Sequence, residues 1–171
     1  MSIPVSWVVS LLAALEPAAP WQATYEKTAE AIARVSESDP LWSADDKGEE
    51  RTASLLVSIA WYESRLKPSA KSSNGRWYCL YQIDKSYLGP NPEKALTDQE
   101  LCTRTAIKII RKSMTLCAAR PPDERLAIFM SGQCDRGGVE SRYRMFLAQK
   151  LLREHPVPIA EGGGVPSAPS R

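Results

Sequence analysis

Histidine is nearly absent from this sequence of 171 residues, in which His155 is the only one. A Ser-His-Asp triad would have to use that residue, which stands beside Pro156 at the start of a Pro- and Gly-rich segment and would be a poorly held base. The cysteines show no CxxC spacing, so a zinc site is not expected either. These absences argue against serine-hydrolase chemistry and against a metal centre.

The sequence also lacks a long hydrophobic run and a strong charge. The apolar stretch near the N-terminus, residues 3–15, is short of the ~20 residues that cross a bilayer. No basic residue precedes it, since the first is Lys27, so the charged start of a secretory signal is missing. A cleaved signal stays as the alternative, because Ala18-Ala19 supplies small residues where a signal peptidase could cut. We expect a first helix that packs on the domain, and no membrane span. The net charge is +2 with dispersed Lys and Arg, so nucleic acid is not an expected partner.

Helical periodicity is the main pattern in this sequence, and its length is typical of one domain. A turn signal at Asn74-Gly75 followed by an aromatic stretch, 77–83, predicts a short strand or hairpin arm. We expect helical segments 1–47 packing on a main domain, 48–153, and a flexible Pro/Gly-rich tail, 154–171. The predicted helices are 5–15, 21–38, 49–64, 97–118 (opened by the capping-box pattern of 97–100), 121–132 and 139–153.

Glu63 is the candidate catalytic residue. It stands near the end of an apolar run, residues 55–64, that predicts a buried helix. A carboxylate at such a boundary is partly removed from water, which favours its protonated form. A carboxylic acid that keeps its proton can protonate a poor leaving group such as a glycosidic oxygen. The alternative is a surface Glu at a helix end, or one paired with Arg65.

Three sequence blocks around Glu63 resemble the lytic transglycosylase branch of the lysozyme-like superfamily. That family shows Ile-Ala-x-x-Glu-Ser, then Pro-x-Ala-x-Ser, then Gly-Leu-Met-Gln-Ile. The present chain has Ile-Ala-Trp-Tyr-Glu-Ser at 59–64, Pro-Ser-Ala-Lys-Ser at 68–72 and Cys-Leu-Tyr-Gln-Ile at 79–83. The blocks occur in the same order within 25 residues. The similarity covers roughly residues 48 to 147.

The resemblance implies a mainly α (α+β lysozyme-like) domain with one small β-hairpin beside the cleft. It implies Glu63 as the acid-base residue and contacts to substrate, or support of Glu63, from residues at the matching positions. These are Ser64, Ser72, Tyr81, Gln82 and Phe129. The chain departs from the family at Phe129 and Met130, where the family has Tyr and Asn, and at Cys79 and Tyr81, where it has Gly and Met.

By resemblance, the chain is expected to cleave the bond between N-acetylmuramic acid and N-acetylglucosamine in peptidoglycan with one Glu and no cofactor. The product would be a 1,6-anhydro sugar. No Asp or Glu lies between Glu63 and Gln82, and Asp84 is the nearest second carboxylate. A lysozyme-type hydrolase using Glu63 and Asp84 is therefore the alternative enzyme, although Asp84 also suits a cap for the turn 85–87. A non-catalytic glycan-binding or structural relative, for example in a phage tail, is the other alternative.

The cysteines at 79, 102, 117 and 134 indicate two disulfides or four buried thiols. Cys102 and Cys117 fall on one predicted helix, ~22 Å apart at 1.5 Å per residue, too far for a bridge. Cys79 is thus expected to pair with Cys102 or Cys117, and Cys134 with the remaining one. Disulfides are typical of an extracytoplasmic protein, either in a phage virion or exported.

Overall fold

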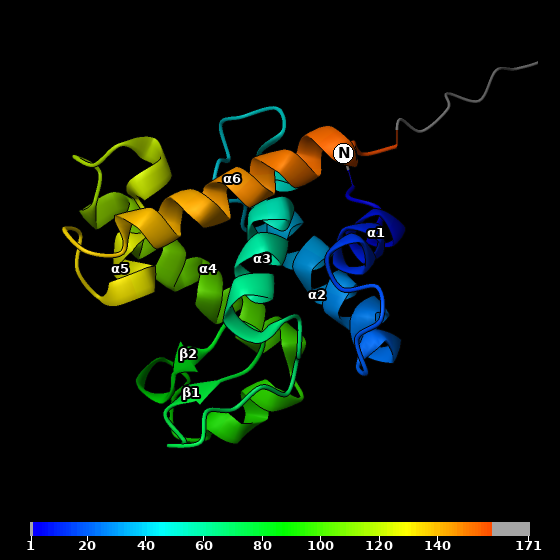
Figure 1. Ribbon diagram of the computed structural model, residues 1–171, viewed down its shortest axis with the longest axis horizontal. Coiled ribbons are helices and arrows are strands. Elements are labelled where there is room, and N and C mark those ends of the chain that lie inside the picture. The colour runs from blue at the N-terminus through cyan, green and yellow to red at the C-terminus, as the bar shows by residue number, and fades with distance from the viewer. Residues whose placement is uncertain (1, 159–171) are drawn as a thin grey trace, which may run out of the picture.

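Helix α3 (Gly48–Ser64) runs through the middle of the molecule, and three other helices pack against it (Figure 1). In this computed structural model, which describes residues 2–158, the nine consecutive residues 52–60 are all buried. A helix that is buried on every side needs its polar side chains satisfied internally. Thr52 and Ser54 meet this need by bonding to backbone carbonyls of the preceding turn.

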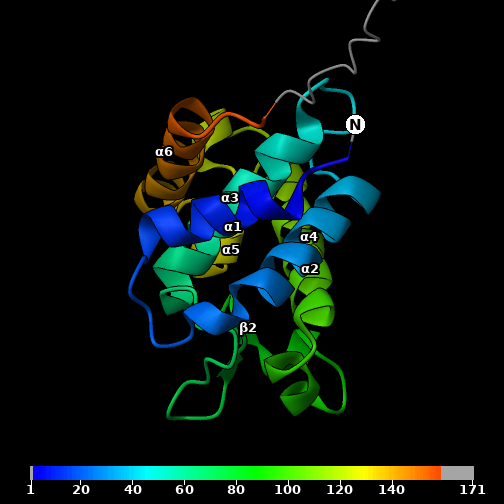
Figure 2. The ribbon, with the colours of Figure 1, turned by 90° about the vertical axis from the view of Figure 1, so that its right-hand side faces the viewer.

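Two N-terminal helices cover one side of α3. α1 (Val5–Leu15) and α2 (Tyr25–Ser38) pack on each other and on α3, as Figure 2 shows from that side. Leu11, Leu12 and Ile32 are fully buried and belong to the same hydrophobic core as α3. The N-terminal segment therefore shares the core of the main domain.

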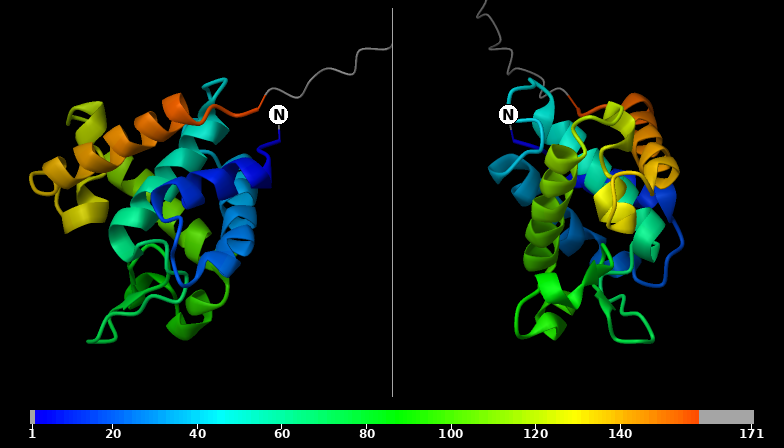
Figure 3. Two further views of the ribbon diagram at one scale, coloured as in Figure 1. Left: turned by 45° about the vertical axis from the view of Figure 1, so that its right-hand side comes forward. Right: turned by 90° about the vertical axis from the view of Figure 1, so that its left-hand side faces the viewer.

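The remaining helices complete the enclosure. α4 (Gln99–Leu116) packs on α2, the short α5 (Ala127–Ser131) packs on α4 and α6, and α6 (Gly138–Glu154) crosses α3. Both views in Figure 3 show α6 lying across α3 at the end of the molecule opposite the hairpin. Ser58 of α3 fixes this crossing, because its Oγ donates to the carbonyl of Arg144 at 2.8 Å.

A small antiparallel sheet lies beyond the C-terminal end of α3. β1 (Trp77–Tyr78) pairs with β2 (Ile83–Asp84), with Trp77 opposite Asp84. The turn between the strands, residues 79–82, begins and ends on non-glycine residues with positive φ, Cys79 at 59° and Gln82 at 47°. The stretch predicted as one strand or hairpin arm is thus both strands and their turn.

The predicted fold class, mainly α with one small hairpin, is confirmed. Several boundaries differ. The segment 21–38 begins with a 3-10 turn (Gln22–Thr24), and 121–132 is divided into a 3-10 turn (Pro122–Glu124) and α5. The capping-box pattern predicts Thr97 as the residue that caps α4. In the structure Asp98 is the cap, since its side chain accepts from Leu101 N, whereas Thr97 donates to the carbonyl of Lys94.

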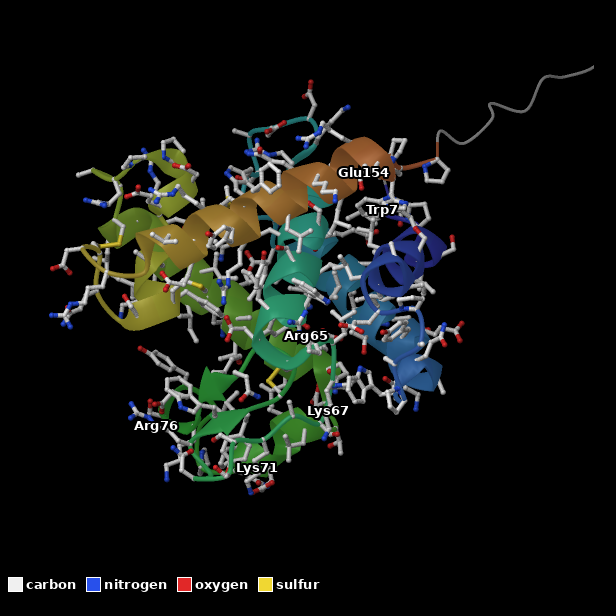
Figure 4. All side chains as sticks on the ribbon, in the orientation of Figure 1. Trp7, Arg65, Lys67, Lys71, Arg76 and Glu154 are labelled. Atoms are coloured by element: carbon white, nitrogen blue, oxygen red, sulfur yellow. A yellow bond between two sulfur atoms is a disulfide. The ribbon has the colours of Figure 1, made fainter. Side chains whose placement is uncertain are left out.

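The start of the predicted tail belongs to the folded domain. The indole of Trp7 donates to the carbonyl of His155 at 2.7 Å, and Val157 packs against the core. Figure 4 shows Trp7 beside Glu154 at the end of α6. The rest of the predicted tail, from residue 159, lies outside the described residues.

Candidate functional site

Glu63 lies in the last turn of α3, one residue before the helix ends. The helix stops because Arg65 and Leu66 both adopt left-handed conformations, with φ of 53° and 61°. Leu66 is nevertheless fully buried, and its burial holds the backbone in this turn. The Glu63 carboxylate is thereby presented where the buried helix reaches the surface, and its side chain is 23% exposed.

Arg144 of α6 contacts the Glu63 carboxylate. Its Nη2 donates to Glu63 Oε1 at 2.8 Å, and its guanidinium lies over the ring of Tyr62 at 4.7 Å. Among residues 2–158, Glu63 Oε2 has no hydrogen-bond partner. The Glu63 carboxylate is thus partly shielded from water and lies against one cation. The partner expected for a structural Glu63 was Arg65, which instead approaches Glu16 at 3.9 Å.

Left-handed backbone conformations at non-glycine residues gather around this site. In the described part of the chain they occur at Arg65, Leu66, Cys79 and Gln82, all within the two segments next to Glu63. Each such residue costs on the order of 1 kcal/mol or more, and strained backbone of this kind clusters at functional sites. The strain is therefore concentrated where the sequence places the candidate chemistry.

Ser64 and Ser72 have structural bonding partners. Ser64 Oγ donates to the carbonyl of Leu80 at 2.7 Å, which ties α3 to the hairpin. Ser72 Oγ accepts from the backbone N–H of Trp77 at 2.9 Å and donates to Asn74 Oδ1 at 2.6 Å, which organises the turn before β1. Both residues are partly exposed, so they support the site's framework and keep some surface.

Gln82, Tyr81 and Phe129 have different surroundings. The Gln82 amide donates to the carbonyl of Cys79 at 3.1 Å across the turn, and its side chain is partly exposed. Tyr81 is fully buried, so it has no surface to offer a sugar and belongs to the core instead. Burial raises the pKa of its phenol, and the neighbouring Thr103 side chain offsets a smaller part of this effect. Phe129 is half-buried on α5 and packs against the core.

Asp84 caps the 3-10 turn η2 (Lys85–Tyr87), as its position in the sequence predicted. Its Oδ1 accepts from Ser86 N at 2.9 Å and its Oδ2 from Arg76 Nε at 2.6 Å. These bonds, that from the Ser86 N–H first and that from Arg76 second, lower the pKa of Asp84 to about 2. Both carboxylate oxygens are occupied, so Asp84 is a structural residue in this conformation.

Basic side chains stacked on aromatic rings border the site. Arg65 lies over Trp61 at 4.0 Å, Arg76 over Trp77 at 4.9 Å, and Arg144 over Tyr62. Figure 4 shows Arg65 where α3 passes into the following loop, and Arg76 beside the hairpin. Such contacts occur roughly once per 70–80 residues. Of these contacts, that of Arg144 over Tyr62 lies next to Glu63 and gives this surface an apolar ring face beside hydrogen-bond donors.

Two disulfides hold the framework, Cys79–Cys102 and Cys117–Cys134. This is one of the two pairings left open by the sequence. The first joins the start of the hairpin turn to α4, and the second joins the end of α4 to the loop after α5. In residues 2–158 no three His, Cys, Asp or Glu side chains gather as a metal site requires, and no helix is long and apolar enough to span a membrane.

Arg144 is the site residue that sequence reasoning missed. It lies 81 positions after Glu63, on a helix whose spacing gives no sign that it faces α3. Comparisons with protein-family models, curated proteins and solved structures gave no match. The resemblance to lytic transglycosylases accordingly depends on the three sequence blocks around Glu63.

Proposed function

We propose that the protein is a peptidoglycan lytic transglycosylase in which Glu63 acts as the acid and then as the base. The observation that carries the proposal is the placement of one carboxylate at the surface end of a buried helix, bordered by strained backbone. The order of the three sequence blocks supports the same function. Peptidoglycan glycan strands are the proposed substrate, and the reaction uses no cofactor.

Two proton transfers make up the proposed reaction. Glu63 first gives its proton to the oxygen that links N-acetylmuramic acid to N-acetylglucosamine, and the bond from the anomeric carbon to that oxygen breaks. The resulting carboxylate then removes the proton from the muramyl 6-hydroxyl, whose oxygen attacks the anomeric carbon. A 1,6-anhydro ring forms, Glu63 regains its proton, and no water is consumed.

The Glu63 carboxylate has a geometry compatible with both roles. Arg144 occupies Oε1, so Oε2 is the oxygen on which the proton can be carried. The acid step releases the proton from this oxygen and the base step returns a proton to it, so neither step requires the bond at Oε1 to break.

A water-activating second carboxylate has weaker support. Asp84, the candidate for the hydrolase alternative, has both oxygens bound to Ser86 and Arg76. A hydrolase would release products that carry an added water, whereas the transglycosylase releases anhydro products. Mass spectrometry of fragments from purified cell walls therefore separates the two enzymes.

The decisive variant is Glu63→Gln, which keeps the size of the side chain and removes the proton. We expect it to fold like the wild type and to release no anhydromuropeptides. Glu30→Gln, an exposed substitution on α2, is the matched control and should keep full activity. Full activity of Glu63→Gln would show that Glu63 does not do this chemistry.

A catalytically silent glycan-binding protein is the second candidate. Two observations favour it: the ion pair that already occupies Glu63, and Phe129, which has no hydroxyl where the resembling family has one. Such a protein would bind insoluble peptidoglycan and release no soluble fragment. In either case the two disulfides support an extracytoplasmic location, in a phage particle such as its tail or in another exported assembly.

A further inference from the structure

Arg144 differs from the other arginines that form ion pairs in the described residues. Its side chain is 11% exposed, whereas the arginines of the other pairs are at least 39% exposed. Surface pairs contribute little and rearrange easily, but a desolvated charge is strongly tied to its partner. Glu63 is the one carboxylate that Arg144 contacts within residues 2–158.

The guanidinium is held from several directions. Its Nη1 donates to the carbonyl of Glu140 at 3.0 Å, one turn earlier on α6, and its face lies over Tyr62. Ser58 Oγ fixes the Arg144 backbone to α3 at 2.8 Å. The atom Nε is buried and has no partner in the described part of the chain. Arg144 is therefore a fixed donor that points at one oxygen of Glu63.

The donor comes from α6, in which no sequence pattern predicts one. The short helix α5 carries Phe129 and Met130 where the resembling family has a hydroxyl and an amide, so at these positions α5 supplies no polar side chain. A carboxylate that must deliver and retrieve a proton needs a fixed orientation, since small misplacements reduce the rate strongly.

We infer that Arg144 is the positioning residue of this site: it fixes the Glu63 carboxylate through Oε1 and leaves Oε2 toward the sugar. The ring of Tyr62 helps to hold the Arg144 guanidinium in place by packing against its face. The inference rests on the proposed function, and it assigns the orientation of Glu63 to an ion pair between α3 and α6.

The test compares Arg144→Met, Arg144→Lys and wild type on purified soluble glycan strands. Arg144→Met keeps an apolar stem over Tyr62 and removes the donor. We expect its kcat to fall about 100-fold with KM little changed. Arg144→Lys keeps the charge without the planar fork, so part of the rate should return. Arg153→Met, an exposed change in the last turn of α6, is the control and should match wild type.

Guanidinium ions provide a second readout that a purely structural role would not move. Added at millimolar concentration to Arg144→Ala, whose truncated side chain leaves room for the ion, they should raise kcat. They should leave wild type and Arg153→Met unchanged. Should the truncated variants fail to fold, Arg144→Lys decides alone, and a kcat equal to wild type overturns the inference.

The outcomes separate this inference from the proposed function. If wild type releases anhydro products, Glu63→Gln releases none and Arg144→Met remains within about twofold of wild type, the proposed function stands and the positioning role is wrong. If wild type itself releases no anhydro products, the transglycosylase proposal is overturned together with the role of Arg144.

Discussion

The hydroxyl of Ser64 donates to the carbonyl of Leu80 at 2.7 Å and joins the helix that carries Glu63 to the turn of the hairpin. Ser64 is the last residue of α3, and Leu80 is fully buried between Cys79 and Gln82, which both have a left-handed backbone. This bond links α3 directly to the hairpin, whereas the Cys79–Cys102 disulfide links the hairpin to α4. The position of the hairpin relative to Glu63 depends on the Ser64 bond in particular.

Ser64→Ala is therefore expected to loosen the site as well as the fold. Loss of the bond leaves a buried carbonyl without this partner, a cost of about 1–2 kcal/mol in the free energy of unfolding. Urea denaturation measures that loss, and release of anhydromuropeptides should fall in parallel. Ser69→Ala, an exposed change in the same loop, should alter neither quantity. Unchanged stability of Ser64→Ala would contradict the role given to this bond.

The two disulfides are predicted to have similar effects on stability and different effects on activity. Their cysteines are 23 and 17 positions apart, so in the chain-entropy model removing either costs about 3 kcal/mol. Only Cys79–Cys102 is attached to the left-handed turn next to Glu63. The double variant Cys79→Ala/Cys102→Ala should lose catalysis at temperatures where it is still folded.

The matched control is Cys117→Ala/Cys134→Ala, which should keep its activity under the same conditions. Thermal denaturation followed by circular dichroism first establishes that both double variants are folded at the assay temperature. Equal loss of activity in the two variants would show that the first disulfide has no specific connection with the site.

We expect Asp84 to contribute to the stability of the fold in a way that depends on pH. Its pKa in the folded protein is lowered to about 2 by the Ser86 N–H and by Arg76, below the value of about 3.9 for an unperturbed Asp. A lowered pKa means that the contribution is fully present above the unfolded value and is lost as the pH falls through the folded value. Asp84→Asn should thus be less stable than wild type at pH 7, with the difference disappearing between about pH 4 and pH 2.

Denaturant titrations of both proteins across this pH range measure the difference. Asp135→Asn, at an exposed Asp in the loop before α6, serves as the control and should show no comparable trend. A stability difference that stays constant down to pH 2 would mean that the Asp84 carboxylate is not held by these bonds.

Gly48 begins α3, and a side chain there has no room. A Cβ at this position would lie 1.9 Å from the carbonyl oxygen of Trp42. Helix propensity alone predicts that Gly48→Ala stabilises α3 by about 1 kcal/mol, whereas the clash predicts a destabilisation of roughly 2 kcal/mol or more. Gly132→Ala serves as the comparison without a clash, since that position has a φ of 80° and open space around an added Cβ. It should cost only about 1–2 kcal/mol for the left-handed backbone. A stabilised Gly48→Ala would refute the close approach.

Local patterns were sufficient to predict much of the fold. The apolar run before Glu63 predicted the buried helix, and Asn74-Gly75 with its aromatic neighbours predicted the hairpin. They failed where long-range contacts decided the local structure. The segment 121–132 has one helical pattern, but Ser113 and Ser141 bind its backbone and accommodate a break: Ser113 Oγ contacts Arg125 O and Ile128 N, and Ser141 Oγ contacts Asp123 O and Leu126 N.

By itself the sequence determined the class of fold and the exclusion of a Cys102–Cys117 bridge, because helical periodicity and helix length are local properties. It also singled out Glu63 as the candidate catalytic residue, because the motif that surrounds Glu63 is made of residues close to it in the chain. Only the tertiary structure decided that Tyr81 is in the core, that Cys79 pairs with Cys102, and that Arg144 faces Glu63. These depend on how helices far apart in the chain cross one another, and no local pattern encodes the direction in which a side chain of α6 meets α3.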